Sequence, residues 1–169
     1  TIRHAAFQVA SIVTTTGFAT TDFDLWPGFS KAILLCLMVV GASAGSTGGG
    51  FKCGRLLLVL KSLRRSVRKV VNPQKVEVVR MNGNPISEKV LQNTNAYLAA
   101  YVIITGVSFL LISIDGFSIT TNISAVLACF NNIGPGFEMV GPACNFSSYS
   151  IFSKLVLIMD MLAGRLEIF

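Results

Sequence analysis

The sequence predicts an all-α membrane protein made of repeated units, each with a span, a re-entrant loop and a second span. Only 13% of its 169 residues are charged and 52% are hydrophobic, whereas soluble domains carry about 25% charged residues. Residues 90–114 form an uncharged, largely apolar run that is long enough to cross a bilayer. The third observation is internal similarity, because the pattern of residues 29–41 returns at residues 152–164.

A short helix at the start of the chain is expected to lead into the stretch IVTTTGFATTDFDLW, residues 12–26. A buried core does not favour three threonines, a glycine and an acidic turn, and an ordinary surface loop does not lie this close to apolar helix. The stretch is therefore a candidate for function. A second helix then follows over residues 29–41.

This second helix breaks in the sequence GASAGSTGGG, residues 41–50, and resumes at about Arg55. Irregular backbone at membrane depth persists only where it is buried in protein or lines a water-filled cavity. Broken helices of this kind form the substrate sites of many transporters. The alternative is a linker between two short soluble helices, and the apolar sequence on both sides argues against it.

Positive charge gathers between residues 52 and 80, in a chain whose formal net charge is +6. The cations there are Lys52, Arg55, Lys61, Arg64, Arg65, Arg68, Lys69, Lys75 and Arg80. Nucleic acid or anionic lipid could bind such a run, but beside apolar spans the positive-inside rule favours a cytoplasmic flank. Four acidic residues outside the run fit an external face that attracts cations. They are Asp22, Asp24, Asp115 and Glu138.

A small cytosolic hairpin is expected around Asn82-Gly83, because this dipeptide is a strong signal for a tight turn between two strands. The hairpin divides the chain into three predicted parts. These are residues 1–71, residues 72–89 with the hairpin, and residues 90–169. The third part contains the clean span, a segment at residues 122–131 that is too short to span, a turn-rich loop and another apolar helix. Because the sequence begins at Thr1 and ends within an apolar pattern, we expect it to be a piece of a longer protein.

The repeat gives these elements an order. FSKAILLCLMVVG (residues 29–41) aligns without gaps on FSKLVLIMDMLAG (residues 152–164). Upstream, Gly17-Phe18 aligns with Gly136-Phe137 if the second copy carries a four-residue insertion. The chain therefore contains about one and a half copies of a span–loop–span unit.

A chain that enters the membrane and returns exposes backbone groups that need a polar partner. A dehydrated cation is a suitable one, since rings of carbonyl oxygens replace the hydration shell in potassium filters. Thr14, Thr15 and Thr16 can stay extended with their carbonyls inward, while Gly17 can adopt a positive φ. In the second copy, Gly134, Pro135 and Gly136 offer a similar mixture of stiffness and freedom. The units are thus predicted to be span–pore-loop–span repeats with re-entrant pore helices.

Five stretches together resemble the Trk/Ktr family of potassium-uptake transporters, most closely its TrkH type. They are TTTGFATTDFDLWP, GASAGSTGGGFK, VRMNGNPISE, NIGPGF and MLAGRLEIF. The resemblance covers essentially the whole chain, and it is specific because all five occur in order. It implies four repeats around one pore, of which this chain supplies part of the third and most of the fourth. Repeats 1 and 2 would come from the rest of the same subunit.

The resemblance also implies roles for individual residues. The filter, with K⁺ on backbone carbonyls, would comprise Thr14, Thr15, Thr16, Gly17, Asn132, Ile133, Gly134, Pro135 and Gly136. The gate would comprise an intramembrane loop and an arginine that faces it, namely Gly41, Gly45, Ser46, Thr47, Gly48, Gly49, Gly50 and Arg165. An arginine in a membrane helix is costly and usually functional, although it can also snorkel to the interface.

Partners and location are implied in the same way. The family functions as a homodimer in the bacterial cytoplasmic (inner) membrane, in contact with lipid. In the Trk system the dimer binds a cytosolic ring of nucleotide-binding TrkA-type regulatory subunits, and the basic stretch and hairpin would belong to that docking face. No cofactor is expected on this chain, and potassium is the transported substrate.

Other classes of function have little support. Gly45 and Gly50 have the spacing of a P-loop, but Phe51 precedes Lys52 where the pattern requires glycine. One histidine and four cysteines without a C-x-x-C pair do not predict an enzyme or a metal centre. A non-transporting membrane scaffold or sensor subunit remains an alternative, as does a pore for sodium or ammonium. The roles of Asp160 and Glu138 stay open.

Overall fold

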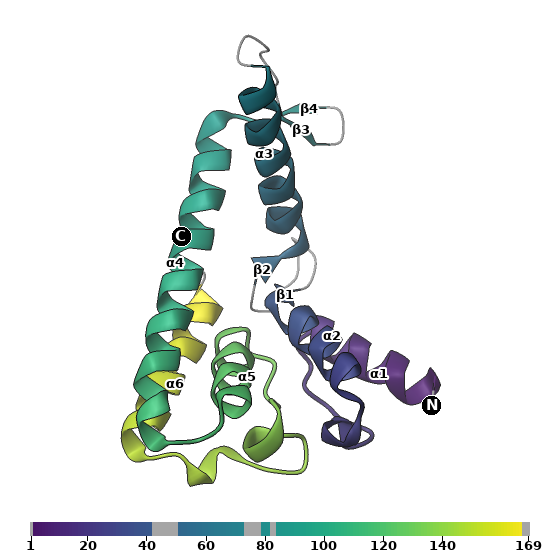
Figure 1. Cartoon of the computed structure of the whole chain (residues 1–169), viewed down its shortest axis with the longest axis vertical. Helices are drawn as coiled ribbons and strands as arrows, with labels where there is room; N and C mark the ends of the chain where they lie inside the picture. Colours follow the sequence, from purple (N-terminus) through teal and green to yellow (C-terminus); the bar gives the residue numbers. More distant parts are fainter. Residues whose placement is uncertain (1, 42–50, 73–78, 82–83, 167–169) are drawn as a thin grey trace.

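The chain is mostly helical. A computed structural model describes residues 2–41, 51–72, 79–81 and 84–166. The α-helices of this part are α1 (Ile2–Val13), α2 (Gly28–Val39), α3 (Cys53–Val71), α4 (Glu88–Ile112), α5 (Ile119–Phe130) and α6 (Ile151–Leu166). Single turns of 3-10 helix are η1 (Phe23–Leu25), η2 (Ser113–Asp115), η3 (Glu138–Val140) and η4 (Phe146–Ser148). As Figure 1 shows, α4 runs almost the length of the molecule, with α5 and α6 beside its lower half and with α1 and α2 on the far side of α5.

The predicted long span corresponds to α4. Within the described residues, Glu88–Asp115 is the one helical segment that is long and apolar enough to cross a membrane. The helix stops where Gly116 takes a left-handed φ of 75° and its N–H bonds to the Ser113 carbonyl. Side chains such as Val102, Ile103 and Leu110 are exposed along it, as expected for a helix that contacts lipid or further helices.

Several of the described helices, among them α1, α2 and α5, are too short to span. α1 and α5 have twelve residues each, or about 18 Å at 1.5 Å per residue, against a hydrocarbon thickness of about 30 Å. α5 begins at Ile119, three residues before the predicted segment, because the Ser118 side chain accepts the Thr121 N–H and caps the helix. Helices α1 and α5 are each followed by a turn and then by another helix, which is α2 with twelve residues after α1 and α6 with sixteen residues after α5.

Two separate helices flank the predicted break of the first unit. α2 ends at Val39, and α3 begins at Cys53. Between them, β1 (Val40–Gly41) and β2 (Phe51–Lys52) pair as parallel strands. Residues 42–50 lie outside the described residues. The strand pairing nevertheless places their two flanks side by side.

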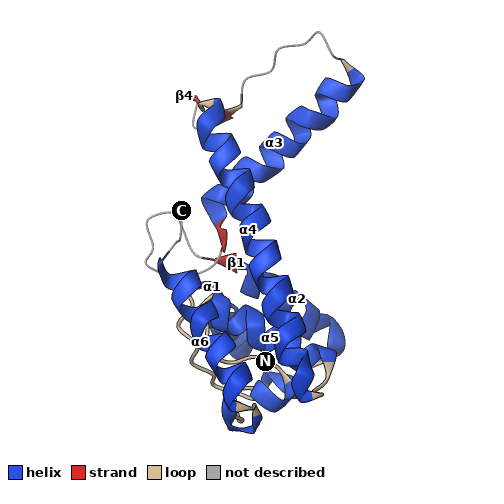
Figure 2. Ribbon diagram, turned by 90° about the vertical axis from the view of Figure 1, so that its left-hand side faces the viewer, coloured by secondary structure: helices blue, strands red, loops and turns tan. Residues whose placement is uncertain are grey.

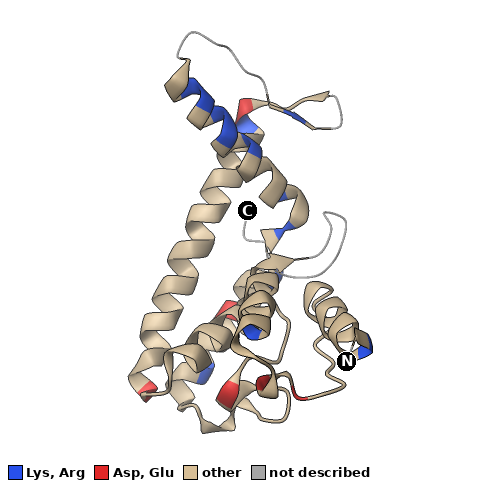
Figure 3. Ribbon diagram, turned by 45° about the vertical axis from the view of Figure 1, so that its right-hand side comes forward, with Lys and Arg blue, Asp and Glu red and all other residues tan. Residues whose placement is uncertain are grey.

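The predicted hairpin is present as the antiparallel pair β3 (Arg80–Met81) and β4 (Asn84–Pro85). It lies beside α3 and the start of α4, away from the short helices (Figure 2). The Lys61 ammonium donates to the Arg80 carbonyl at 2.8 Å, and Arg65 pairs with Glu88 at 2.6 Å. Basic residues gather at this end, whereas most acidic residues lie at the opposite end (Figure 3).

Two hydrophobic clusters hold the lower half together. The first joins α4, α5 and α6 through Ile112, Ala125, Val126, Cys129, Val140, Tyr149 and Leu157. The second joins the two repeats through Ile12, Phe23, Leu34, Met38, Ile133 and Phe137. In the second cluster the rings of Phe23 and Phe137 meet edge to face with centroids 5.4 Å apart. The turn after α5 is thus buried against α1 and α2.

Candidate functional site

The turn after α1 has an unusual backbone. The Thr15 N–H donates to the Ile12 carbonyl at 3.1 Å. The Thr16 N–H reaches back to the Ser11 carbonyl at 2.9 Å. Thr15 adopts φ 55° and Gly17 adopts φ 78°. Side chains other than Asn and Asp rarely occupy this left-handed region, so the surrounding hydrogen bonds must hold Thr15 in it.

The turn after α5 repeats this conformation. The Asn132 N–H donates to the Cys129 carbonyl at 3.0 Å. The Ile133 N–H reaches back to the Ala128 carbonyl at 2.9 Å. Asn132 adopts φ 54° and Gly134 adopts φ 106°. The two turns are therefore equivalent in hydrogen bonding and in the order of their left-handed residues.

This equivalence corrects the sequence alignment. Gly17 corresponds to Gly134 in conformation, so its pairing with Gly136 is wrong by two residues. Gly136 instead donates its N–H to the Val140 carbonyl at 2.7 Å and packs closely on Ser124. The alignment followed the Gly-Phe dipeptide common to both copies, whereas the conformation depends on the distance from the helix end.

The two turns touch each other. A β-carbon built on Gly17 would lie 2.2 Å from the Ile133 carbonyl oxygen and 3.3 Å from the Pro135 ring. Such a distance leaves no room for a side chain, so the Gly17 backbone rests directly on the second turn. Residues from two different repeats, far apart in sequence, thus meet through main chain.

The carbonyl oxygens of the two turns accept no main-chain hydrogen bond within the described residues. This holds for residues 14–17 and 132–135. Thr14, Thr16 and Gly134 are exposed. The Thr14 hydroxyl bonds to the Ala10 carbonyl and to the Thr16 hydroxyl, both at 2.7 Å. Hydroxyl contacts of this kind hold the turn in its conformation.

Helix α6 contacts the second turn and the end of α5. The Asn132 amide donates to the Met161 carbonyl at 3.2 Å and to the Phe130 carbonyl at 3.4 Å. A β-carbon on Gly164 would lie 1.7 Å from the Phe130 carbonyl oxygen, so the two helix backbones are in contact there. Arg165, the predicted gate arginine, is the next residue and is exposed. The structure thus places Arg165 directly after Gly164, where α6 contacts the C-terminal end of α5.

Of the other predicted gate residues, the structure describes Gly41. Gly41 is buried in β1, and the Cys53 thiol donates to its carbonyl at 3.1 Å. The remaining predicted gate residues lie outside the described residues. They are Gly45, Ser46, Thr47, Gly48, Gly49 and Gly50.

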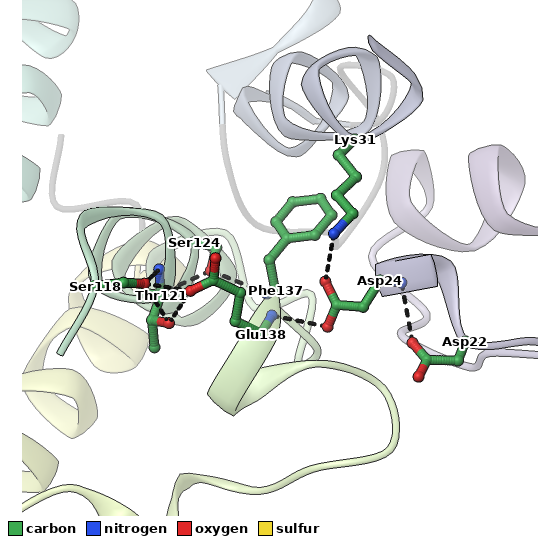
Figure 4. Close-up of polar contacts among 8 residues, drawn as sticks. All are labelled: Asp22, Asp24, Lys31, Ser118, Thr121, Ser124, Phe137 and Glu138. Atoms are coloured by element: carbon green, nitrogen blue, oxygen red, sulfur yellow. Dashed lines mark hydrogen bonds and ion pairs between the residues drawn. The ribbon is translucent and has the colours of Figure 1, made fainter. Parts of the chain in front are cut away.

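Asp24 makes a second connection between the two repeats. Its carboxylate accepts the Glu138 N–H at 2.7 Å and forms an ion pair with Lys31 at 3.6 Å (Figure 4). Asp22 caps η1 by accepting the Asp24 N–H at 3.0 Å. The same Asp24 oxygen approaches Gly141 so closely that a β-carbon there would lie 2.2 Å away. Two acidic residues predicted to attract cations are therefore also structural.

Glu138 is tied to the start of α5. Its carboxylate accepts the hydroxyls of Ser118 and Thr121, the latter at 2.8 Å (Figure 4). These two hydroxyls, in the order named, lower the pKa of the Glu138 carboxyl below its ordinary value, and the charge of Lys31 adds to the effect. Glu138 therefore carries a negative charge at the end of the second turn and stabilises the N-terminus of the short helix.

Asp160 faces a neighbouring helix. It is 3% exposed, and the Ser108 hydroxyl on α4 donates to its Oδ1 at 2.6 Å. Within the described residues its Oδ2 has no hydrogen-bond partner. Asp160 therefore pairs α6 with α4.

Sequence reasoning missed the contacts that join distant segments. Asp24 and Glu138 are 114 residues apart, and nothing in their local sequence indicates that one accepts the N–H of the other. Tyr101 and Asn131, whose side chains are hydrogen-bonded, form a second such pair. The one available signal was the repeat, which predicts that the segments after α1 and α5 are neighbours but does not identify the side chains between them.

The chain has close relatives among known transport proteins. Over residues 1–169 it matches the family described as "TrkH: Cation transport protein". The Trk system potassium uptake protein TrkH of Escherichia coli (strain K12) is 39% identical over 169 residues, which are 100% of this chain and 35% of that protein. TrkI of Halomonas elongata is 33% identical over 99% of this chain and 34% of its own length. The crystal structure of the potassium transporter TrkH from Vibrio parahaemolyticus matches with a TM-score of 0.85 at 38% identity, over 98% of this chain and 35% of that one.

The fold and the paired turns define a helical membrane protein of repeated units. The chain belongs to the TrkH family of cation transport proteins. This confirms the resemblance to Trk transporters and the prediction that the chain is not an enzyme, since the family carries cations as substrates. The chain spans about a third, 35%, of the length of the Escherichia coli relative.

Proposed function

We propose that this chain forms two of the four filter segments in a potassium-uptake pore. The observation that carries the proposal is the contact between two equivalent turns, with the Ile133 carbonyl against the Gly17 backbone. Main-chain oxygens of both turns would replace the hydration shell of a potassium ion. The relatives named as potassium uptake proteins support this choice of ion.

The filter segments comprise residues 14–17 and 132–136. The left-handed residues in each turn change the direction of successive carbonyls, and Asp24, Asn132 and Glu138 hold the turns in place by hydrogen bonds. The family's remaining repeats would complete the ring. We also propose the division of the chain at residues 71 and 89 into two repeat portions and a cytosolic hairpin.

The proposed orientation follows from charge. The basic end of α3 and the hairpin would be cytoplasmic by the positive-inside rule, and the acidic loops would face the outside of the cytoplasmic membrane (Figure 3). The cytoplasmic end would contact a TrkA-type regulatory subunit, and the complete subunit would form a homodimer. These partners rest on the family resemblance.

Ion flux in liposomes tests the function directly. The complete subunit is reconstituted, and uptake of radioactive rubidium is measured with competing potassium or sodium outside. We expect uptake that potassium blocks at a concentration about tenfold lower than sodium does, which corresponds to about 1.4 kcal/mol of discrimination.

Two results would contradict the proposal. No uptake with or without the regulatory subunit and nucleotides would favour the scaffold or sensor alternative. Uptake that sodium or ammonium blocks as well as potassium does would assign the same turns to a different ion. Liposomes without protein serve as the control.

A gate is proposed at Gly41 and Arg165, the described residues of the predicted set. We expect Arg165→Ala to raise rubidium flux in the absence of a regulatory subunit. Removing a fixed positive charge near the ion path lowers the electrostatic barrier to a cation, and about 1.4 kcal/mol corresponds to a tenfold higher rate. The same liposome assay measures the effect.

Lys154→Ala is the matched control for charge removal. Lys154 lies on the same helix, but its ammonium donates to the Ser147 carbonyl near the opposite end. This variant should leave flux unchanged. Equal flux for wild type and Arg165→Ala would show that Arg165 is not part of the gate.

A further inference from the structure

A buried hydrogen bond joins the long span α4 to the end of α5. The Asn131 amide donates to the Tyr101 hydroxyl at 3.1 Å, and that hydroxyl lies 3.4 Å from the Asn131 amide oxygen. Asn131 is fully buried and Tyr101 is 6% exposed. A pair of polar groups in such a place is costly unless both partners are satisfied.

The position of Asn131 gives the bond a direct link to the second turn. Its N–H makes the last helical hydrogen bond of α5, to the Leu127 carbonyl at 3.0 Å. The next residue, Asn132, is left-handed. The one after that, Ile133, presents its carbonyl to Gly17. A displacement of Asn131 would therefore move the main chain of the turn.

Within the described residues, the first turn is held differently. The equivalent residue is Thr14, whose hydroxyl bonds to Ala10 and Thr16 within its own turn. Between described residues, none of its side-chain hydrogen bonds reaches another helix. The Thr14 hydroxyl thus fixes its turn locally, whereas the Asn131 amide links the second turn to a neighbouring helix.

The Tyr101 ring is itself held on two sides. It meets Phe130 edge to face with centroids 4.9 Å apart. It also lies at a tilt to Phe51, with centroids 6.4 Å apart. Phe51 is 2% exposed and belongs to β2. These ring contacts therefore fix the position of the Tyr101 hydroxyl that bonds to Asn131.

We infer that Tyr101 and Asn131 are positioning residues for ion selectivity. The Tyr101 hydroxyl fixes the Asn131 amide, which sets the place of the second turn and the direction of its carbonyls. This inference rests on the proposed potassium-pore function. Its effect is on the choice between ions, because carbonyl spacing decides how well each dehydrated ion is coordinated.

Tyr101→Phe in the complete subunit tests the inference. The substitution removes one hydroxyl and keeps the ring contacts. We expect rubidium flux to stay within about twofold of wild type, while sodium permeability relative to potassium rises roughly fivefold, the factor associated with one hydrogen bond. Ion competition in liposomes measures the ratio, and thermal unfolding in detergent measures stability.

Tyr149→Phe is the matched control. Tyr149 donates its hydroxyl to Asn122 at 2.9 Å, and both residues are buried. Asn122 lies near the N-terminus of α5, whereas Asn131 lies at the other end of that helix. Both variants should lose similar stability, but only Tyr101→Phe should change selectivity. If the Tyr101 hydroxyl contributed only to stability, neither variant would change the permeability of sodium relative to potassium. Wild-type permeability ratios in both variants would therefore contradict the inference.

A double variant keeps the test decisive if Tyr101→Phe does not fold. Combining Tyr101→Phe with Asn131→Leu leaves no unpaired polar side chain at this place, so folding should be retained. Altered selectivity in this protein supports the inference, and wild-type selectivity overturns it. Absence of flux in the wild-type protein would instead contradict the proposed function itself.

Discussion

Gly17→Ala is expected to abolish the preference for potassium over sodium, with a loss of tenfold or more. Gly17 has a φ of 78°, a conformation that costs an L-residue about 1–2 kcal/mol. Its new methyl group would also lie 2.2 Å from the Ile133 carbonyl oxygen. The obstacle is main chain, so relief requires moving a carbonyl that the proposed filter uses. Ion competition in liposomes measures the change.

Gly116→Ala separates backbone strain from the collision. Gly116 has a φ of 75°, almost the same as Gly17, but a β-carbon there would meet no atom within 4 Å. Gly116→Ala should therefore lower the stability of the protein by a similar amount and leave ion selectivity intact. Gly17→Ser should behave as Gly17→Ala does. If Gly17→Ala and Gly116→Ala gave the same selectivity, the contact with Ile133 would have no functional role.

Local signals in the sequence were sufficient for the elements that depend on local chemistry. The uncharged run at residues 90–114 predicts a span because hydrocarbon excludes charge, and α4 occupies Glu88–Ile112. Asn82-Gly83 predicts the hairpin, and Arg80 pairs with Pro85 on either side of it. The predicted break in the second helix stays a prediction, since most of it lies outside the described residues, between α2 and α3.

The register of the repeat was harder to predict, for a physical reason. Left-handed conformation is usually a property of glycine, but here Thr15 and Asn132 also adopt it. Thr15 is neither a glycine nor an asparagine, so the sequence gives no warning of this conformation in the first turn. An alignment guided by glycine therefore joined Gly17 to Gly136 and missed its true counterpart, Gly134.

Contacts across repeats could not be predicted because they depend on packing between elements. Asp24 looks like any acidic residue in a loop, and its bond to the Glu138 N–H exists only because the two turns meet. Tyr101 looks like an ordinary aromatic residue of a span. Its partner Asn131 is identified only once α5 is placed against α4. The predicted filter residues are therefore brought together by residues that the sequence does not mark.

Gly164→Ala is expected to prevent α6 from packing on α5, and so to reduce both folded protein and flux. A β-carbon at this position would lie 1.7 Å from the Phe130 carbonyl oxygen and 3.3 Å from the Asn132 amide. The two helices would have to separate, which breaks the bond from Asn132 to the Met161 carbonyl. Overpacking of a core typically costs about 1–3 kcal/mol. We expect the upper end or more, because backbone cannot rotate away as a side chain can.

Gly106→Ala is the control, since Gly106 lies in the middle of α4 and a β-carbon there meets nothing within 4 Å. Alanine should stabilise that helix by up to about 1 kcal/mol. Thermal unfolding in detergent compares the two variants, and liposome flux reports on the turn. Because the second turn rests on α6 through Asn132, a folded fraction of Gly164→Ala should also lose selectivity. A Gly164→Ala protein as stable and as selective as Gly106→Ala would mean that α6 does not support the turn in the membrane.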